Sequence, residues 1–411
     1  MHWSHAGGAA RFTSHERDRR WQRIRSAMER QGIDWLLVFP QWQEADALYI
    51  ANITGVTLFP LQGEPILVLG GEDSNLAVTR EGWIADRRSA TASGSTRVPY
   101  GEAVASVLRS LSIGSATVGI AGLAGHNYAS VRQPEGYLNH TTTLRVLEAL
   151  PRARVVDGTP VLAEARYVKG PEEIDALRES VLLAERSLQP LVDHGRVGAS
   201  QAEIFGQILV EQIKGHSDTP MLAWCPGRWG ERKHRYTTAP PGELQPETQV
   251  VLEIGPSISG YGAQIAQTYF VDQPPRAAVD AFELSKAAFN RALEVMRPGG
   301  TWGEVEDQVK AVARGGDLCI DFLVHGRGLG NDGPLLIPTE THARTRQDRL
   351  EAYTVFIVKP GAFPTENDPA RSHDVRFGDT VLVGPERTER LGTRPQVLLS
   401  GSAPGAAPRT R

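Results

Sequence analysis

Apolar residues recur along the first part of the chain at two spacings, which predicts a mixture of strands and helices. The short apolar runs have the length of buried strands and lie at 33–40, 56–61, 64–70 and 116–121. Residues 16–31 and 101–111 repeat apolar side chains at helical spacing, with Ser14 as the expected N-cap and Gly32 at the end of the first helix. This alternation indicates an α/β domain, which we place at residues 15–155.

The second part of the chain carries longer helical segments and further strands, and we place a second domain at residues 160–400. Pro171 followed by Glu172 predicts a helix start, because proline suits the first turn and an acidic side chain favours a helix N-terminus. That helix is expected to reach about residue 192. The other expected elements are helices at 200–214, 277–296 and 302–314, a loop at 224–241, and strands at 354–361 and 374–383.

Two further apolar segments, 250–254 and 265–271, flank a turn rich in glycine, proline and serine, which predicts a hairpin. Glu253 and Gln264 lie 11 residues apart, one at each strand, so the hairpin can bring their side chains together. A carboxylate inside an apolar strand is costly unless it is paired. We therefore expect Glu253 to have a partner elsewhere in the chain.

Composition excludes several classes of function. The 411 residues have a formal net charge of -4 without long runs of one sign, which argues against nucleic acid or an anionic membrane as the partner. Two cysteines, Cys225 and Cys319, do not make a disulfide framework, and a reducing, cytoplasmic location is expected. The chain has no apolar run of about 18 residues, and we expect neither a membrane span nor a secretory signal.

A series of short motifs resembles the pita-bread family of creatinase, aminopeptidase P, prolidase and methionine aminopeptidase. The resemblance covers about residues 15 to 400, and its motifs are residues 166–174, Gly260-Tyr261, His325-Gly326, Pro360-Gly361 and Arg376. It implies an α+β fold class, with a pita-bread C-terminal domain after a smaller creatinase-type N-terminal α/β domain. It also implies a homodimer.

The metallopeptidases of this family bind two divalent ions through two Asp, one His and two Glu, which are suitable ligands for such ions. Carried over residue by residue, the two Asp positions fall on Glu253 and Gln264, and the two Glu positions fall on Lys359 and Gly378. The resemblance therefore implies that the dinuclear metal site is lost, and no cofactor is expected.

The remaining ligand positions do not restore the metal site. The family histidine falls on His325 in one alignment and on Leu329 in another. Asp379 lies beside Gly378, but adjacent residues of a strand point to opposite faces of the sheet. We therefore expect no metallopeptidase activity in either alignment.

Two histidines remain as candidate catalytic side chains. Creatinase, the metal-free precedent in the family, hydrolyses a small guanidino acid with a loop histidine as proton shuttle, and the resemblance assigns His234 to that place. His325 is assigned to the same site by its glycine-rich context. An imidazole titrates near pH ~6.5, so it can both accept and donate a proton. The alternative is that His234 is a surface residue of the basic cluster at 232–235.

Lys359 and Glu253 are the other two candidate catalytic side chains. In the family these two positions lie on either side of the metal pair, so the resemblance implies an ion pair between them. The ammonium of Lys359 could bind a substrate carboxylate or a developing oxyanion. Because a lysine repels a guanidinium, we expect an anionic or carbonyl-bearing substrate rather than a creatine-like one. The alternative is a structural pair that fills an inactive site.

Four residues are candidates for substrate binding, namely Gln264, Arg327, Tyr261 and Arg376. Arg327 could grip a carboxylate bidentately, whereas Arg376 could instead hold the end of the sheet and Tyr261 could simply pack. We expect a metal-independent enzyme that acts on a small polar molecule by hydrolysis, lyase chemistry or cyclisation. The alternatives are a non-catalytic binding or interaction protein and, third, residual peptidase activity through one ion held elsewhere.

Overall fold

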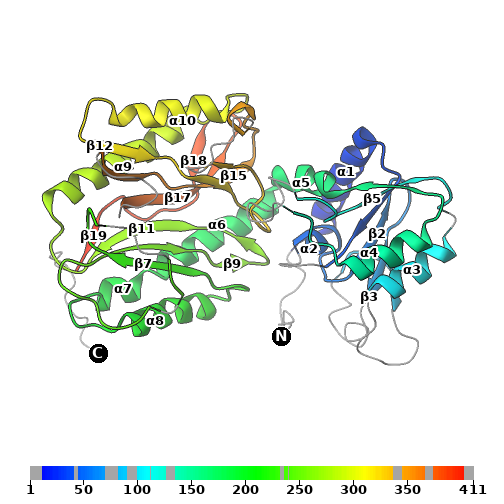
Figure 1. Ribbon diagram of the computed structural model, residues 1–411, viewed down its shortest axis with the longest axis horizontal. Coiled ribbons are helices and arrows are strands. Elements are labelled where there is room, and N and C mark those ends of the chain that lie inside the picture. The colour runs from blue at the N-terminus through cyan, green and yellow to red at the C-terminus, as the bar shows by residue number, and fades with distance from the viewer. Residues whose placement is uncertain are drawn as a thin grey trace. The chain divides into compact units, whose positions relative to one another are not determined.

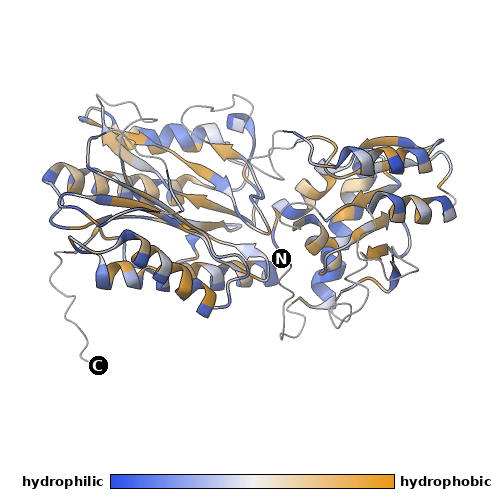
Figure 2. Cartoon of the chain, turned by 60° about the horizontal axis from the view of Figure 1, so that its bottom comes forward, coloured by the Kyte–Doolittle hydropathy of each residue, from blue (hydrophilic) through white to orange (hydrophobic). Residues whose placement is uncertain are grey.

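The computed structural model describes most of the chain, and its described residues form two compact units. These residues are 12–40, 45–69, 82–89, 100–111, 113–125, 135–231, 236–238, 240–336, 345–365 and 374–401. The first unit consists of residues 1–172 together with 329–333, and the second of residues 173–328 and 334–411. Figure 2 shows apolar residues concentrated along the strands within each unit.

A six-stranded mixed sheet forms the centre of the first unit, in the order β4-β3-β2-β1-β5-β6. The central strand β1 runs antiparallel to β2 and parallel to β5. Its residues Leu36, Leu37 and Val38 are buried, as a strand covered on both faces requires. The strands are β1 (Trp35–Val38), β2 (Val56–Pro60), β3 (Ile66–Leu69), β4 (Asp86–Ser89), β5 (Thr117–Ile120) and β6 (Arg154–Asp157).

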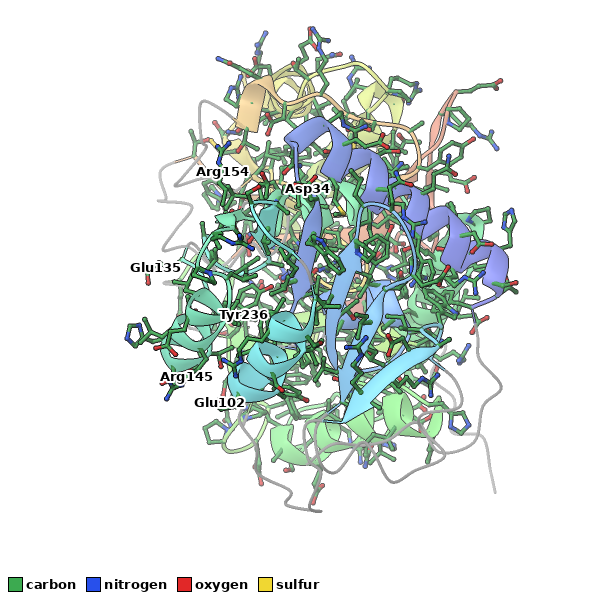
Figure 3. The ribbon with its side chains drawn as sticks, turned by 90° about the vertical axis from the view of Figure 1, so that its right-hand side faces the viewer. Asp34, Glu102, Glu135, Arg145, Arg154 and Tyr236 are labelled. Atoms are coloured by element: carbon green, nitrogen blue, oxygen red, sulfur yellow. The ribbon has the colours of Figure 1, made fainter. Side chains whose placement is uncertain are left out.

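The two helices predicted in the first unit are present close to their predicted positions. The first helix is capped by Thr13 rather than Ser14, and Gly32 ends it in the left-handed conformation at φ 65°. Residues 45–51, 140–149 and 159–167 form helices where none was predicted. The helices are α1 (Ser14–Gln31), α2 (Ala45–Ala51), α3 (Tyr100–Ser110), α4 (His140–Ala149) and α5 (Thr159–Tyr167). Figure 3 labels Glu102 of α3 and Arg145 of α4, which form an exposed ion pair at 2.8 Å.

Arg20 of α1 is buried in an aromatic cage. Its guanidinium carbon lies 4.4 Å from the ring centre of Phe12, 4.9 Å from Tyr49 and 5.1 Å from Trp83. Its Nε donates to Glu16 at 2.7 Å, and both side chains are 1% exposed. This pair therefore stabilises the first unit through a desolvated charge contact and several cation–π contacts.

We expect Arg20→Ala to lower the free energy of unfolding by about 3 kcal/mol, because it leaves the buried carboxylate of Glu16 with less compensation. Urea-induced unfolding measures this loss. Arg145→Ala is the matched control, since its ion pair is exposed, and it should leave the urea midpoint unchanged. Equal effects of the two substitutions would contradict the expectation.

A curved antiparallel sheet forms the centre of the second unit, and its main path runs in the order β14-β13-β15-β17-β11-β8-β7. Strand β7 includes Trp224, where a loop was predicted. Pro226 is tolerated there because β7 is the last strand on this path, and proline is compatible with a sheet edge. The strands of the path are β7 (Leu222–Gly227), β8 (Gln249–Ile254), β11 (Ile265–Phe270), β13 (Val324–Gly326), β14 (Leu335–Leu336), β15 (Thr354–Val358) and β17 (Val375–Val383).

Shorter strands extend this sheet beside the main path. They are β12 (Leu318–Asp321), which pairs with β16 (Gly361–Pro364), and β18 (Thr388–Arg390) and β19 (Leu399–Ser400), which pair with β17 and β11. The small hairpin of β9 (Ser257–Ile258) and β10 (Tyr261–Gly262) lies in the turn between β8 and β11.

Helices cover one face of this sheet. Phe282 and Phe289 of α9 pack edge-on against Phe377 of β17, and Trp302 of α10 packs against Phe356 of β15. Figure 1 shows α9 and α10 beside this part of the sheet and α8 beside β7. The helices are α6 (Pro171–Arg186), α7 (Gln189–His194), α8 (Gln201–Lys214), α9 (Arg276–Val295) and α10 (Trp302–Lys310).

The long helix predicted from residue 171 to about residue 192 is interrupted. It ends at Arg186, and α7 begins at Gln189 with a proline at its second position. Pro190 has no N–H to donate and restricts the residue before it, which explains the break. Among the described helices, none combines the length and the apolar character that crossing a membrane requires.

Candidate functional site

Strand register places a row of side chains on the face of the second sheet that α9 and α10 do not cover. Ala266 of β11 lies opposite both Glu253 of β8 and Gly378 of β17. Lys359 directly follows β15 and lies beside Gly378. Residues opposite each other share a face, and Phe377, the neighbour of Gly378, points to the helices. Lys359 and Glu253 therefore converge from separate strands.

Lys359 and Glu253 form the ion pair that the resemblance implies. The Lys359 Nζ donates to Glu253 Oε1 at 2.8 Å, and the two residues are 4% and 9% exposed. Burial lowers the pKa of Lys359, and the carboxylate of Glu253 opposes that shift. Because the pKa remains lowered, desolvation outweighs the attraction within the pair. The predicted contact is confirmed, while its role in chemistry stays a prediction.

Gln264 completes the contact around Glu253. Its Nε2 donates to Glu253 Oε2 at 2.6 Å, so the two carboxylate oxygens are held by different strands. The backbone of Gln264 is also fixed, because its N–H donates to Thr380 Oγ1 at 2.9 Å and its carbonyl accepts from that hydroxyl at 2.7 Å. The predicted side-chain contact between Glu253 and Gln264 is confirmed, and it is diagonal, because the strand register pairs Glu253 with Ala266.

His325 lies on the same face as Lys359. It is 8% exposed, and it pairs with Ile357, two positions before Lys359. Its Nδ1 lies 3.1 Å from the carbonyl oxygen of Gly326, which can only accept a hydrogen bond. Nδ1 therefore carries the proton in this contact, and in the neutral ring Nε2 is the basic nitrogen. His234 lies outside the described residues.

Arg376 is held by a buried set of acceptors. It donates from Nη1 to the Lys359 carbonyl at 2.9 Å and from Nη2 to Asp321 Oδ2 at 2.6 Å, and it also pairs with Asp374. Burial would lower the pKa of Arg376, but the carboxylates of Asp374 and Asp321 raise it well above its usual value. These contacts favour the structural alternative, in which Arg376 positions the backbone at Lys359.

Arg327 and Tyr261 also direct their polar atoms at the protein. Arg327 donates to the backbone carbonyls of Gly262 at 2.9 Å and Ala263 at 2.8 Å. The Tyr261 hydroxyl donates to Glu173 and is buried. To bind a substrate carboxylate, Arg327 would have to share or give up its hydrogen bonds to the two carbonyls. The buried contact of Tyr261 favours the alternative in which its side chain simply packs.

Tyr236 is a candidate site residue that was not predicted from the sequence. Thr237 bridges to Trp224, which sets Tyr236 opposite Cys225 of β7 and on the face of the sheet that carries Glu253. Although part of the residue is exposed, burial around the hydroxyl and the charge of Glu253 raise its pKa well above the usual value. A phenol with a raised pKa is a hydrogen-bond donor. Tyr236 lies in the segment predicted as a loop at 224–241, so no local pattern indicated that its hydroxyl would lie near Glu253.

Asp379 points away from this face. Its Oδ2 accepts from Arg390 at 2.8 Å and from Arg394 at 2.9 Å. Burial raises the pKa of Asp379 despite the two arginines. The expectation that Asp379 cannot substitute at the position of Gly378 is therefore consistent with the alternation of side chains along β17.

The part of the chain that the structure describes has surface hollows but no cluster of metal ligands. Within the described ranges, no group of three or more His, Cys, Asp or Glu side chains is placed to hold a metal ion. Two surface hollows, of about 430 and 330 Å³, lie away from the pair of Lys359 and Glu253. One is lined by α1 in the first unit, and the other by residues of α9 and the segment 312–318 in the second.

Comparison with known proteins places the second unit in a family of enzymes. The model of metallopeptidase family M24 matches residues 175–385. A probable dipeptidase PepE of Mycobacterium tuberculosis (strain ATCC 25618 / H37Rv) is 26% identical over 246 residues, which are 57% of this chain and 64% of that protein. A creatinase of Bacillus sp. (strain B-0618) is 22% identical over 249 residues, 56% of this chain and 59% of that protein. The match thus spans under two thirds of each relative.

Solved structures resemble the whole chain. Dipeptidase PepE from Mycobacterium ulcerans has a TM-score of 0.71 at 19% identity and covers 96% of this chain and 100% of its own. Prolidase from Pyrococcus furiosus has a TM-score of 0.69 at 18% identity, with 90% and 99% covered. The fold class predicted from the sequence is confirmed: a smaller α/β N-terminal unit precedes a pita-bread sheet.

Proposed function

Because the chain belongs to metallopeptidase family M24, we propose that it is a hydrolase-like enzyme that has exchanged its metal ions for the ion pair of Lys359 and Glu253. Its substrate is a small polar molecule with a carboxylate or carbonyl group, and the reaction is hydrolysis, lyase chemistry or cyclisation. The similarity to both a probable dipeptidase and a creatinase supports a hydrolytic origin. The main support for this proposal is the ammonium group of Lys359, which is buried and paired with Glu253.

The side chains of this cluster do not fit a pair of divalent ions. A protonated lysine has no lone pair for a metal and repels it electrostatically. Both oxygens of Glu253 already accept hydrogen bonds, from Lys359 and Gln264. Gly378 has no side-chain ligand atom, and its carbonyl already accepts a hydrogen bond from Arg394. The donor set therefore suits an anionic or polarised oxygen better than a cation.

The same groups have distinct uses in a metal-independent reaction. The Lys359 ammonium stabilises negative charge that develops on a substrate oxygen, and Glu253 keeps the ammonium oriented. His325 accepts a proton at Nε2 and returns it, and His234 remains the proposed second proton carrier. Tyr236 joins them as a donor to a substrate oxygen. Arg376 keeps the Lys359 backbone in place through its carbonyl contact.

The competing proposal is a non-catalytic binding protein. Both carboxylate oxygens of Glu253 accept hydrogen bonds from other side chains of the protein. An inactive site filled by its own side chains would have the same contacts, which favours the binding protein. Neither of the two hollows described above includes this pair. The two proposals differ in whether Lys359 is needed for turnover or only for stability.

We expect the protein to convert at least one small carboxylate, amide or lactam in a proton NMR screen carried out in EDTA. Lys359→Met should abolish that turnover, because it removes the charge that stabilises the developing oxyanion. Turnover that survives in folded Lys359→Met would contradict the proposal. A screen without any turnover would favour the binding protein.

A second experiment tests whether the protein binds a divalent metal ion. Calorimetric titration with Mn²⁺ should give no saturable heat for the natural protein, whereas Lys359→Glu, which places a second carboxylate beside Glu253, should bind Mn²⁺. Stoichiometric Mn²⁺ binding by the natural protein would show that a metal site persists. It would favour residual peptidase activity instead.

A further inference from the structure

Gln264 contacts Glu253 with its amide nitrogen, and this contact fixes the direction of the whole amide group. A carboxylate paired with an ammonium can only accept hydrogen bonds, so the group 2.6 Å from Glu253 Oε2 must be Nε2. The Gln264 Oε1 therefore points away from Glu253. The orientation of an amide is often ambiguous, but here the chemistry of its partner decides it.

The oxygen that points away is a buried acceptor without a hydrogen bond. Gln264 is 2% exposed, and in the described part of the chain its Oε1 has no donor within hydrogen-bonding distance. Buried polar atoms are nearly always paired, and an unpaired one costs free energy. Its backbone is held by Thr380, so the side chain cannot relieve this by moving with the strand.

Lys359 supplies a donor on the other side of the same carboxylate. Its ammonium has three N–H groups, and among the described residues its hydrogen bond goes to Glu253 Oε1. Lys359 and Gln264 thus hold the two oxygens of one carboxylate. The ammonium of Lys359 and the amide of Gln264, whose Oε1 is unpaired, thus flank the same carboxylate.

We infer that this pair recognises a carbonyl with an N–H beside it, as in an amide, a lactam or a ureide. The carbonyl oxygen accepts from Lys359, and the N–H donates to Gln264 Oε1. A carboxylate or an ester would instead set an oxygen against Oε1, which is unfavourable. The inference rests on the proposed function and narrows its substrate class. Since Oε1 is closed off from water, the side chains that cover it move when the ligand binds.

The test uses the full chain and three ring compounds of similar size. They are 2-pyrrolidone, with an N–H beside its carbonyl, N-methyl-2-pyrrolidone, which lacks the N–H, and γ-butyrolactone, which has an ether oxygen there. Ligand-observed NMR measures their dissociation constants. We expect 2-pyrrolidone to bind at least tenfold more tightly than either analogue, because the analogues leave Oε1 unpaired.

Gln264→Met should bring the three affinities within about twofold of one another, since it removes the acceptor. The comparison among ligands in the natural protein does not depend on whether this variant folds. Similar affinities for the three compounds in the natural protein, or no binding of any, would overturn the inference. A preference for 2-pyrrolidone that persists in folded Gln264→Met would do so as well.

A separate arm distinguishes this inference from the proposed function. Lys359→Met should weaken all three compounds by a similar factor, because each presents a carbonyl oxygen to the ammonium. If Lys359→Met bound the three compounds as tightly as the natural protein does, Lys359 would not contact the carbonyl oxygen, which would contradict the proposed function. Equal affinities in the natural protein with a uniform loss in Lys359→Met would leave the proposed function standing without the N–H recognition.

Discussion

Lys359→Met should lower the free energy of unfolding by about 3 kcal/mol, because it leaves the carboxylate of Glu253 buried without its cation. The pair joins positions 106 residues apart on strands of one sheet, so its loss should be visible in the unfolding of the second unit. Urea-induced unfolding followed by intrinsic fluorescence measures the change.

The double variant Lys359→Met with Glu253→Met provides the control. Replacing both partners of a buried pair by apolar side chains is often neutral or stabilising, so we expect the double variant to regain most of the lost stability. The expectation fails if the double variant is less stable than Lys359→Met alone. That result would mean that Glu253 stabilises the sheet mainly through Gln264.

Gly378→Ala should lower the free energy of unfolding by about 3 kcal/mol, because the sheet has no space for a side chain at this position. A Cβ added to Gly378 would lie 2.4 Å from the Lys359 Cβ and 2.8 Å from its Cα. Contacts this short cannot be relieved by rotating a flexible side chain. The lysine and the glycine are thus sterically coupled, and residue 378 cannot take a longer side chain unless Lys359 moves.

Gly206→Ala is the matched control for this prediction. Gly206 lies in helix α8, and an added Cβ would meet nothing within 4 Å. Since alanine favours a helix over glycine, this variant should be more stable by about 1 kcal/mol. Thermal and urea unfolding of the two variants, measured side by side, give the comparison. A neutral Gly378→Ala would contradict the close approach of Lys359.

Local patterns in the sequence determined most of the elements and the family. Apolar periodicity placed α1, α3, α8 and α9 to within a few residues, and Gly32 marked a real helix end. The combination of short motifs in one order identified the pita-bread fold. The requirement that a carboxylate in an apolar strand be paired also made a partner for Glu253 necessary.

Strand β7, helix α2 and the break before α7 were not predicted correctly. The pairing of β7 with β8 spans residues distant along the chain, so no local signal at Trp224 distinguishes a strand from a loop. Helix α2 is short, and tertiary packing rather than propensity stabilises such a segment. The break at Pro190 could have been read from the proline itself.

The sequence by itself determined which residue types occupy the positions that the resemblance aligns with metal ligands, and only the tertiary structure decided how these residues contact one another. Glu253 lies on β8, Gln264 directly precedes β11 and Lys359 directly follows β15, so their contacts depend on strand register. Register also turned Arg376 towards Asp321 and brought Tyr236 to the site. The physical reason is that side-chain contacts across a sheet are set by long-range backbone pairing, which a local pattern does not encode.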